Sequence, residues 1–370
     1  MGPTNSRSSI QTAVITASVT RFVYYVLDLL LQVTRNGLYC ADGDFYVDPW
    51  LPVDRAVITH AHSDHACADS RAYLATRPGE ALLRARVGGG ATIQALAYGE
   101  SVVLGGVRVS LHPAGHILGS AQVRIESGGE VWVVSGDYKL EPDPTCAAFE
   151  PVACDAFVTE STFGLPIYRW PPEAEVFAEI RSWWAANRQA GKASMLFAYS
   201  LGKAQRVLAG LNPADGRIYT HGAVENCCRM YREAGIALAP TTHVASAPAT
   251  TDWSGALILA PPSANSSPWM RRFGPLSTGF VSGWMRIRGA RRRRSLDRGF
   301  VLSDHADWPG LMSAVRASGA SRVWVTHGYR APVVEWLKQQ GMDAQTIETR
   351  FEGEQDETGA ESGEPGEAEP

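Results

Sequence analysis

The chain lacks the features that mark a secreted or membrane-spanning protein. Its six cysteines include no C-x-x-C pair, and Cys227 and Cys228 are adjacent, which suits neither a zinc knuckle nor a disulfide framework. No apolar run reaches the roughly 20 residues of a bilayer span, because Arg21 and Asp28 interrupt the apolar stretch near the amino terminus. No small-residue cleavage site follows that stretch. We therefore expect reduced thiols in a cytoplasmic protein without membrane contact.

Basic residues are absent from the last twenty positions. Residues 351–370 carry eight Asp and Glu side chains together with Gly and Pro, and this composition predicts a disordered acidic tail. Removing those eight negative charges from the net charge of −4 leaves +4 for the rest of the chain. The 370 residues suffice for two domains with a substantial core, preceded by an extension of uncertain structure over residues 1–27.

Histidines are few, and they are clustered. The chain has nine, and three of them lie in the segment T-H-A-H-S-D-H over residues 59–65, directly after an apolar run. In a loop that leaves a strand, residues two apart point the same way, so His60 and His62 can converge on one ion. Asp64 and His65 then turn toward a second ion. Scattered surface histidines are the alternative interpretation, which the clustering disfavours.

Three further candidate ligands follow predicted strands. His116 lies in a glycine-flanked turn after the strand expected at 107–111, and Asp137 follows the apolar run 131–134. Gly136, which directly precedes Asp137, lets the backbone come close. His327 follows the run 323–326 in the same way. We expect His116 as the third nitrogen ligand, Asp137 as a bridge between two ions and His327 as the last ligand. Taken singly, each also fits a polar residue that caps a strand.

The order of these motifs resembles a known fold. T-H-A-H-S-D-H, A-G-H-I-L-G-S-A and S-G-D-Y resemble the metallo-β-lactamase fold, in which two β-sheets face each other and loops at one edge hold a dinuclear centre. F-V-T-E-S-T-F-G, V-L-S-D-H-A-D and V-T-H-G resemble the extra motifs of the β-CASP nucleases. The resemblance covers about residues 28–350. Within the family, the chain most resembles the bacterial ligase-associated DNA exonuclease group, also labelled mRNA 3′-end processing factor-like.

The resemblance implies an α/β fold, a metallo-β-lactamase αββα sandwich with an inserted β-CASP α/β domain. The sandwich would occupy residues 28–165 and 300–350, and the insert residues 166–299. The pattern of the insert predicts alternating elements. Helices are expected at 176–187, 202–211 and 224–234 and from 266–268 onward, and strands at 194–199, 217–220 and 256–260. We expect a parallel sheet that caps the metal centre.

The resemblance also assigns ligands and supporting residues. One ion would be held by His60, His62, His116 and Asp137, and the other by Asp64, His65, Asp137 and His327. Asp48 matches the aspartate that braces the histidine loop, and the alternative is an aspartate that starts a turn before Pro49. Ligand type favours two zinc ions, with manganese as the alternative.

Two metals close together lower the pKa of a bridging water, so that hydroxide can attack a phosphodiester. Asp64 is expected to be a catalytic residue as well as a metal ligand. His305 matches a residue near the scissile phosphate and is expected as a phosphate ligand or general acid. Glu160 is expected to orient His305 and raise its pKa. The alternatives are a histidine at a helix start and a carboxylate at a strand end.

An arginine run precedes His305. Its members, opposed only by Asp297, are Arg286, Arg288, Arg291, Arg292, Arg293, Arg294 and Arg298. Arginine forks match phosphate oxygens, so we expect salt-sensitive contact with nucleic acid, with Trp284 stacking on a base. A solvated loop is the alternative. Lys139 and Lys203 are expected to extend this surface, the latter in a strand-to-helix turn that suits phosphate or is a plain helix cap.

These features predict a metal-dependent phosphodiesterase. The group resemblance favours an exonuclease on single-stranded DNA in bacterial DNA repair, associated functionally with a DNA ligase and a helicase, and analogy alone suggests 5′ polarity. RNA processing is the alternative, because the third extra motif has His in RNA-acting members and this chain has His327. A lactamase or thioesterase would need neither the insert nor the arginine run. An inert nucleic-acid-binding scaffold is disfavoured because every ligand position is filled.

Overall fold

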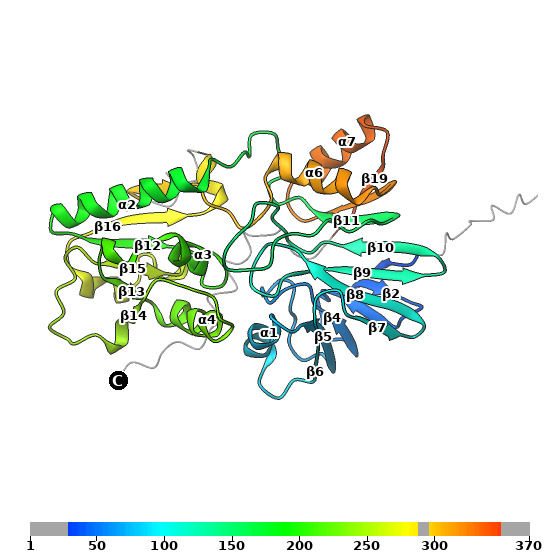
Figure 1. The fold of residues 1–370 in the computed structure, drawn as a ribbon, viewed down its shortest axis with the longest axis horizontal. Helices are drawn as coiled ribbons and strands as arrows, with labels where there is room; N and C mark the ends of the chain where they lie inside the picture. Colours follow the sequence, from blue (N-terminus) through cyan, green and yellow to red (C-terminus); the bar gives the residue numbers. More distant parts are fainter. Residues whose placement is uncertain (1–28, 288–295, 349–370) are drawn as a thin grey trace, which may run out of the picture.

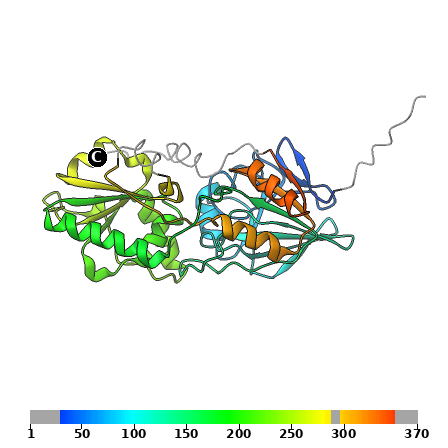
Figure 2. The same ribbon diagram turned by 90° about the horizontal axis from the view of Figure 1, so that it is seen from above.

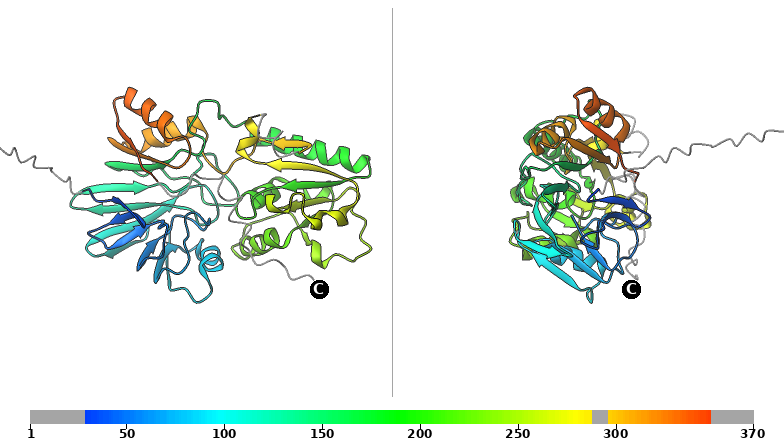
Figure 3. Two further views of the ribbon diagram at one scale, coloured as in Figure 1. Left: turned by 180° about the vertical axis from the view of Figure 1, so that it is seen from behind. Right: turned by 90° about the vertical axis from the view of Figure 1, so that its right-hand side faces the viewer.

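The computed structural model describes residues 29–287 and 296–348. Within them the chain forms three sheets, and the third lies beside the other two in Figure 1, in Figure 2 and in the left view of Figure 3. The expected extension at 1–27 and the acidic tail at 351–370 lie outside the described residues. Among the described helices, none is long and apolar enough to cross a bilayer. No disulfide joins any of the six cysteines, all of which lie within the described residues.

The first sheet is formed by the amino-terminal strands in chain order. Its members are β1 (Gln32–Thr34), β2 (Gly37–Cys40), β3 (Phe45–Val47), β4 (Arg55–Val57), β5 (Ala72–Thr76) and β6 (Ile93–Leu96). Pairing is antiparallel from β1 to β3 and parallel from β3 to β6. Helix α1 (Glu80–Val87) connects β5 to β6, as a parallel pair requires a crossover.

The second sheet combines strands from both sides of the insert. Its order is β19 (Asp343–Thr346), β18 (Arg322–Thr326), β11 (Ala156–Glu160), β10 (Glu130–Val134), β9 (Ala121–Ser127), β8 (Val107–Pro113) and β7 (Ser101–Leu104). Strands β7 to β10 form an antiparallel meander, whereas β10, β11, β18 and β19 are parallel neighbours. The carboxyl ends of β10, β11 and β18 therefore meet at one edge.

The first two sheets pack face to face between helices. Their shared core includes Leu74 of β5 against Val123 and Trp132 of the second sheet. The outer face of the first sheet packs on α1, and that of the second sheet packs on α6 (Trp308–Ser318) and α7 (Arg330–Gln339). Alternate residues of each strand thus face two different apolar layers.

The third sheet is entirely parallel. Its order is β14 (Thr242–His243), β13 (Ile218–Thr220), β15 (Leu257–Ala260), β12 (Ala193–Phe197), β16 (Leu276–Val281) and β17 (Arg298–Phe300). One face packs on α2 (Glu173–Gln189), α3 (Lys203–Gly210) and α4 (Gly222–Glu233). The other face packs against aromatic residues such as Phe273. Burial on both faces explains the largely apolar sequences of the central strands β12 and β15.

The elements predicted for residues 176–260 agree with those observed to within a few residues. The predicted helix from residues 266–268 is instead a short 3₁₀ helix, Pro268–Phe273. It ends at Gly274, which has a φ of 67°. Further 3₁₀ helices span Pro213–Asp215, Val244–Ser246, Pro262–Ala264 and Gly283–Arg286.

Candidate metal centre

Strand ends bring the predicted ligands to one edge of the sheets. Asp137 follows β10, Glu160 ends β11 and His327 follows β18, and these three strands are parallel neighbours. The loop after β4 supplies residues 60–65 from the facing sheet. Gly136 has a φ of 56°, and a Cβ there would lie 2.6 Å from Cβ of Thr59. Glycine therefore permits the close approach of the two loops.

The first group of candidate ligands is formed by His60, His62, His116 and Asp137. All four are buried, and their ligand atoms lie within 4.8 Å of one another. Nδ1 of His62 is 3.1 Å from Nε2 of His60 and 3.1 Å from Nε2 of His116. Oδ2 of Asp137 lies 3.6 and 3.8 Å from the latter two nitrogens. Tetrahedral zinc ligands at about 2.05 Å are about 3.3 Å apart, so this spacing suits one ion.

Hydrogen bonds on the outer nitrogens of two of these imidazoles fix their tautomers. Nε2 of His62 lies 3.2 Å from the carbonyl of Leu201, and Nδ1 of His116 lies 2.9 Å from the carbonyl of Asp304. A carbonyl only accepts, so both outer nitrogens carry protons. Burial lowers the pKa of His62 and brings that of His116 to about 3, so both rings are neutral. Nδ1 of His62 and Nε2 of His116, which face the other candidate ligands, are consequently bare, that is, unprotonated.

The same argument applies to His60. The Thr59 hydroxyl donates to Oδ2 of Asp48 at 2.5 Å, so it accepts the proton of His60 Nδ1 at 3.1 Å. Burial and neighbouring imidazoles lower the pKa of His60. Three bare nitrogens thus converge, and lone pairs 3.1 Å apart repel each other unless a cation lies between them. The donor set fits a divalent metal ion.

The second group is formed by His65, Asp137 and His327, with Asp64 beside it. Nε2 of His65 lies 3.5 Å from Oδ2 of Asp137 and 3.6 Å from Oδ2 of Asp64. Nδ1 of His327 is 4.0 Å from Oδ1 of Asp137. Nε2 of His65 and the Oδ1 atoms of both aspartates are buried without a hydrogen-bond partner among the described residues. A free volume of about 30 Å³ next to His65 and His327 leaves room for water-sized groups.

The second group carries excess negative charge. Burial by itself lowers the pKa of His65, but Asp137, Asp64 and Asp48 together raise it well above its ordinary value. In the metal-free protein the imidazole of His65 is therefore protonated on both nitrogens. A metal ion that binds Nε2 must displace the proton there.

Asp48 lies where the sequence predicted a bracing carboxylate. It accepts hydrogen bonds from the Thr59 amide at 2.8 Å and from Nδ1 of His65 at 2.7 Å. Its φ of 44° is one that aspartate tolerates better than most residues. Through these bonds Asp48 orients ligands of both groups, directly for His65 and through Thr59 for His60.

His305 and Glu160 form a buried pair beside the two groups of candidate ligands, called the metal groups below. Nδ1 of His305 lies 2.9 Å from Oε2 of Glu160, whose Oε1 accepts from the Tyr138 amide at 2.8 Å. The His305 ring is 4.6 Å from that of His116, measured between centroids, and its Nδ1 is 4.0 Å from Oδ2 of Asp137. Burial lowers the pKa of His305, but Glu160 and Asp137 raise it well above its ordinary value. The pair thus holds a proton beside the metal groups.

Two residues predicted to contact nucleic acid are buried instead. Lys139 is 2% exposed and its Nζ lies 2.6 Å from Oε1 of Glu173. Lys203 is fully buried and its Nζ lies 2.7 Å from Oδ1 of Asp304. The prediction of an exposed contact surface at these two lysines is wrong, because each is neutralised by a carboxylate from a distant segment.

The predicted arginine surface is only partly described. Arg286 and Arg298 are exposed, whereas Arg288 and Arg291 to Arg294 lie outside the described residues. Trp284 is half-buried and its ring contacts those of Phe163, Tyr168 and Tyr329. Packing against other aromatic rings therefore occupies part of the surface expected to stack on a base.

Three residues near the centre, Leu201, Asp304 and Arg206, had no role predicted from the sequence alone. The carbonyls of Leu201 and Asp304 fix two ligand imidazoles, and Arg206 donates to the Ser303 carbonyl at 2.7 Å. Asp304 adjoins His305 in sequence, which is a signal for its position. Main-chain contacts such as that of Leu201 leave no side-chain pattern to detect.

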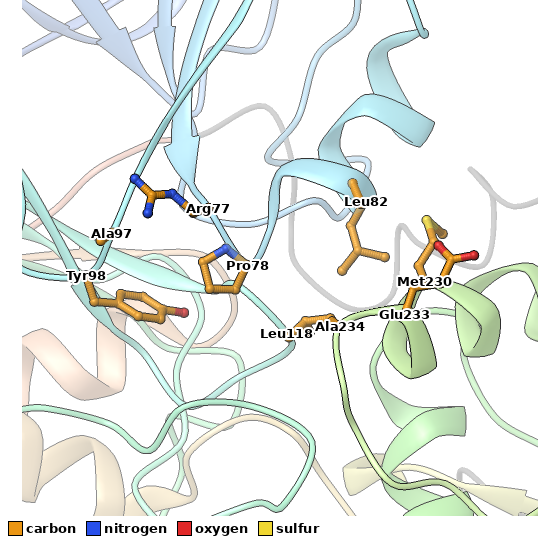
Figure 4. Close-up of a pocket in the computed structure, with 10 residues that line it drawn as sticks. Arg77, Pro78, Leu82, Ala97, Tyr98, Leu118, Met230, Glu233 and Ala234 are labelled. Carbon is orange, nitrogen blue, oxygen red and sulfur yellow. The ribbon is translucent and has the colours of Figure 1, made fainter.

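A roomier cavity of about 520 Å³ lies between α1 and α4 (Figure 4). Its walls are mainly apolar and include Leu82 of α1, Met230 of α4 and Leu118 of the segment between β8 and β9. None of the candidate ligands lines it. The cavity is therefore separate from the metal groups.

No family model matches the chain. A probable DNA ligase from Opitutus terrae is 32% identical over 314 residues, which cover 84% of this chain and 30% of that protein. The endoribonuclease ysh-1 of Neurospora crassa is 31% identical over 128 residues, covering 34% of this chain and 15% of that protein.

A third relative is cleavage and polyadenylation specificity factor subunit 3 of Dictyostelium discoideum. It is 28% identical over 151 residues, which cover 38% of this chain and 19% of that protein. The chain belongs to the β-CASP family of metallo-β-lactamase-fold proteins. It spans less than a third of the length of each of these relatives.

A solved structure supports the fold of this β-CASP protein. A protein of unknown function from Enterococcus faecalis V583 superposes with a TM-score of 0.53 at 11% identity, covering 80% of this chain and 79% of that one. At this identity the likeness concerns the fold alone.

Proposed function

We propose that the protein is a metal-dependent phosphodiesterase that degrades single-stranded DNA from the 5′ end in bacterial DNA repair. The observation that supports this most is the convergence of three bare imidazole nitrogens on Asp137, with the His305–Glu160 pair beside them. The four packed layers fit an αββα sandwich over residues 28–165 and 300–350, and the third sheet fits a β-CASP insert over 166–299.

The chemistry assigned to the residues follows from their positions. Two divalent ions, zinc by ligand type and manganese as the alternative, would supply an activated water and neutralise charge on the phosphate. One ion would be held by His60, His62, His116 and Asp137, and the other by Asp64, His65, Asp137 and His327. His305, kept protonated by Glu160, would bind a phosphate oxygen or give its proton to the departing sugar oxygen.

DNA is preferred over RNA because of how far the similarities extend. The relative named a DNA ligase matches 84% of this chain, whereas the two named for RNA cleavage or polyadenylation match 34% and 38%. Since the ligase relative is much longer, its similarity supports a functional association of this chain with a DNA ligase. RNA cleavage is the second candidate, supported by the endoribonuclease relatives and by His327.

One assay tests substrate, polarity and mode of cutting together. The full-length chain, loaded with zinc or manganese, is incubated with 5′- and 3′-labelled DNA and RNA strands, each linear or circular. The expected result is stepwise shortening of linear DNA from the 5′ end, with circular strands intact. His62→Ala should abolish it, because the first group loses a ligand. His112→Ala is the matched control, since His112 lies in β8 and binds Ser110 and Glu150 instead.

Three outcomes would count against the proposal. Intact DNA and RNA after incubation with either metal would support a nucleic-acid-binding scaffold. Equal cleavage by the wild type and by His62→Ala would place the activity elsewhere in the chain or in a contaminant. Cleavage of RNA alone would replace DNA by RNA as the substrate.

A further inference from the structure

The third sheet contributes directly to the first metal group. The chain leaves β12 and passes through Leu201, whose carbonyl lies 3.2 Å from Nε2 of His62. Gly202 follows with a φ of 86°, and a Cβ there would collide with the side chain of Ile117, the neighbour of His116. A side chain at position 202 would push this turn away from both histidines. The turn is thus shaped to lie against the ligand loops.

Buried ion pairs fasten the next helix to the same place. Lys203 at the start of α3 is fully buried and pairs with Asp304 at 2.7 Å. One turn later, Arg206 donates to the Ser303 carbonyl at 2.7 Å, and its Nε lies 2.7 Å from Oδ2 of Asp143. Removing one partner of a buried pair leaves an uncompensated charge, so these contacts are costly to break.

Asp304 connects its ion pair with Lys203 to His116, a candidate ligand of the first group. Its carboxylate holds Lys203, while its carbonyl accepts the proton of His116 Nδ1 at 2.9 Å. Two ligands, His62 and His116, are therefore oriented by carbonyls of Leu201 and Asp304. The Lys203 side chain joins the two segments that carry those carbonyls.

We propose that Lys203 is a positioning residue that couples docking of the third-sheet unit to metal affinity at the first group. The inference rests on the metal centre proposed above. Loss of partners that orient metal ligands typically weakens metal binding by about 10- to 100-fold. Coupling is reciprocal, so a metal that needs the docked turn also stabilises that docking.

Metal affinity of the full-length chain tests the coupling without any nuclease assay. Zinc affinity is measured by competition with a chromophoric chelator for the wild type, Lys203→Met and Lys192→Met. Lys203→Met should weaken the first zinc equivalent about 10- to 100-fold. Lys192→Met is the matched control, because Lys192 is exposed and precedes the opposite end of β12. It should bind zinc like the wild type.

A double substitution separates charge pairing from a general loss of folding. In Lys203→Met with Asp304→Asn, no buried carboxylate is left uncompensated, so the double variant should bind zinc more tightly than Lys203→Met alone. If the effects of the two substitutions simply add, the pairing does not act through Asp304 and the proposal is overturned.

Hydrogen exchange of the wild type supplies a test that needs no variant. Zinc should slow amide exchange in residues 199–206 as well as in the ligand loops. Unchanged exchange at 199–206 on zinc binding, or wild-type zinc affinity in Lys203→Met, would overturn the coupling. A wild-type chain that binds no metal would instead overturn the proposed function, so the two failures are distinguishable.

Discussion

Nδ1 of His305 and Oε2 of Glu160 lie 2.9 Å apart, and both side chains are almost fully buried. The two residues come from different segments, 145 positions apart in the chain. Low exposure strengthens their mutual attraction, because little solvent screens the charges. The protonated imidazole is thereby maintained beside His116 and Asp137.

Substituting Glu160 should impair proton donation without emptying the metal groups. We expect Glu160→Gln to lower kcat/KM about 10²- to 10⁴-fold with unchanged metal content, a typical size for a lost general acid. The pKa of His305 is raised in the wild type, so the ring stays protonated at pH values above the ordinary pKa of histidine. It loses its proton only as the pH rises through the raised pKa. In the variant the alkaline limb should move to lower pH. Profiles of kcat/KM against pH measure the shift.

Glu175→Gln is the control for that experiment, because Glu175 is exposed in the first turn of α2. Its pH profile should coincide with that of the wild type. An unmoved alkaline limb in Glu160→Gln would mean that His305 is not the titrating acid.

Asp48 should control metal binding at a distance. Asp48→Asn keeps a side chain that tolerates positive φ but removes the charge that holds Nδ1 of His65. We expect metal affinity of the second group to fall about 10- to 100-fold, as measured by calorimetric titration. Asp44→Asn is closely matched, with a φ of 49° and an exposed contact to Arg55, and should leave affinity unchanged. Equal affinities in both variants would contradict the bracing role.

Acid should empty the two groups in order. The pKa of His65 is raised, so protons compete for this nitrogen already at pH values above the ordinary one. The pKa of His116 is about 3 and those of His60 and His62 are lowered, so the first group stays deprotonated to lower pH. As pH falls, one equivalent of metal should leave before the other. Metal analysis after dialysis at graded pH checks this; simultaneous release would contradict it.

The two exposed, described arginines should contribute to nucleic-acid binding through charge. Arg286→Ala with Arg298→Ala should weaken binding of all DNA sequences alike and reduce the slope of log K against log salt by about 1.4, or about 0.7 per phosphate contact for single strands. Binding is measured by fluorescence anisotropy at several salt concentrations. Arg316→Ala, at an exposed position of α6, is the control. An unchanged slope would show that neither arginine contacts phosphate.

Much of the candidate site could be predicted because its signals are local. Each apolar strand is followed within a few residues by a polar side chain, as at His116 and His327, so the position of the ligand is readable from the chain alone. Exposure was not readable. Lys139 and Lys203 looked like a basic surface because Glu173 and Asp304, which neutralise them, are brought there only by tertiary packing. The contribution of the Leu201 carbonyl depends on backbone position, which residue type does not encode.

The order in which the ligands occur along the chain bears on how the protein matures. During synthesis, His60, His62, His116 and Asp137 emerge first, whereas His327 follows Asp137 by 190 residues. A nascent chain therefore possesses the four first-group side chains long before β18 exists. The second group closes only after β18 has been synthesised, because it needs His327. A truncated product that ends before β18 would lack His327, so incomplete molecules carry a defective centre.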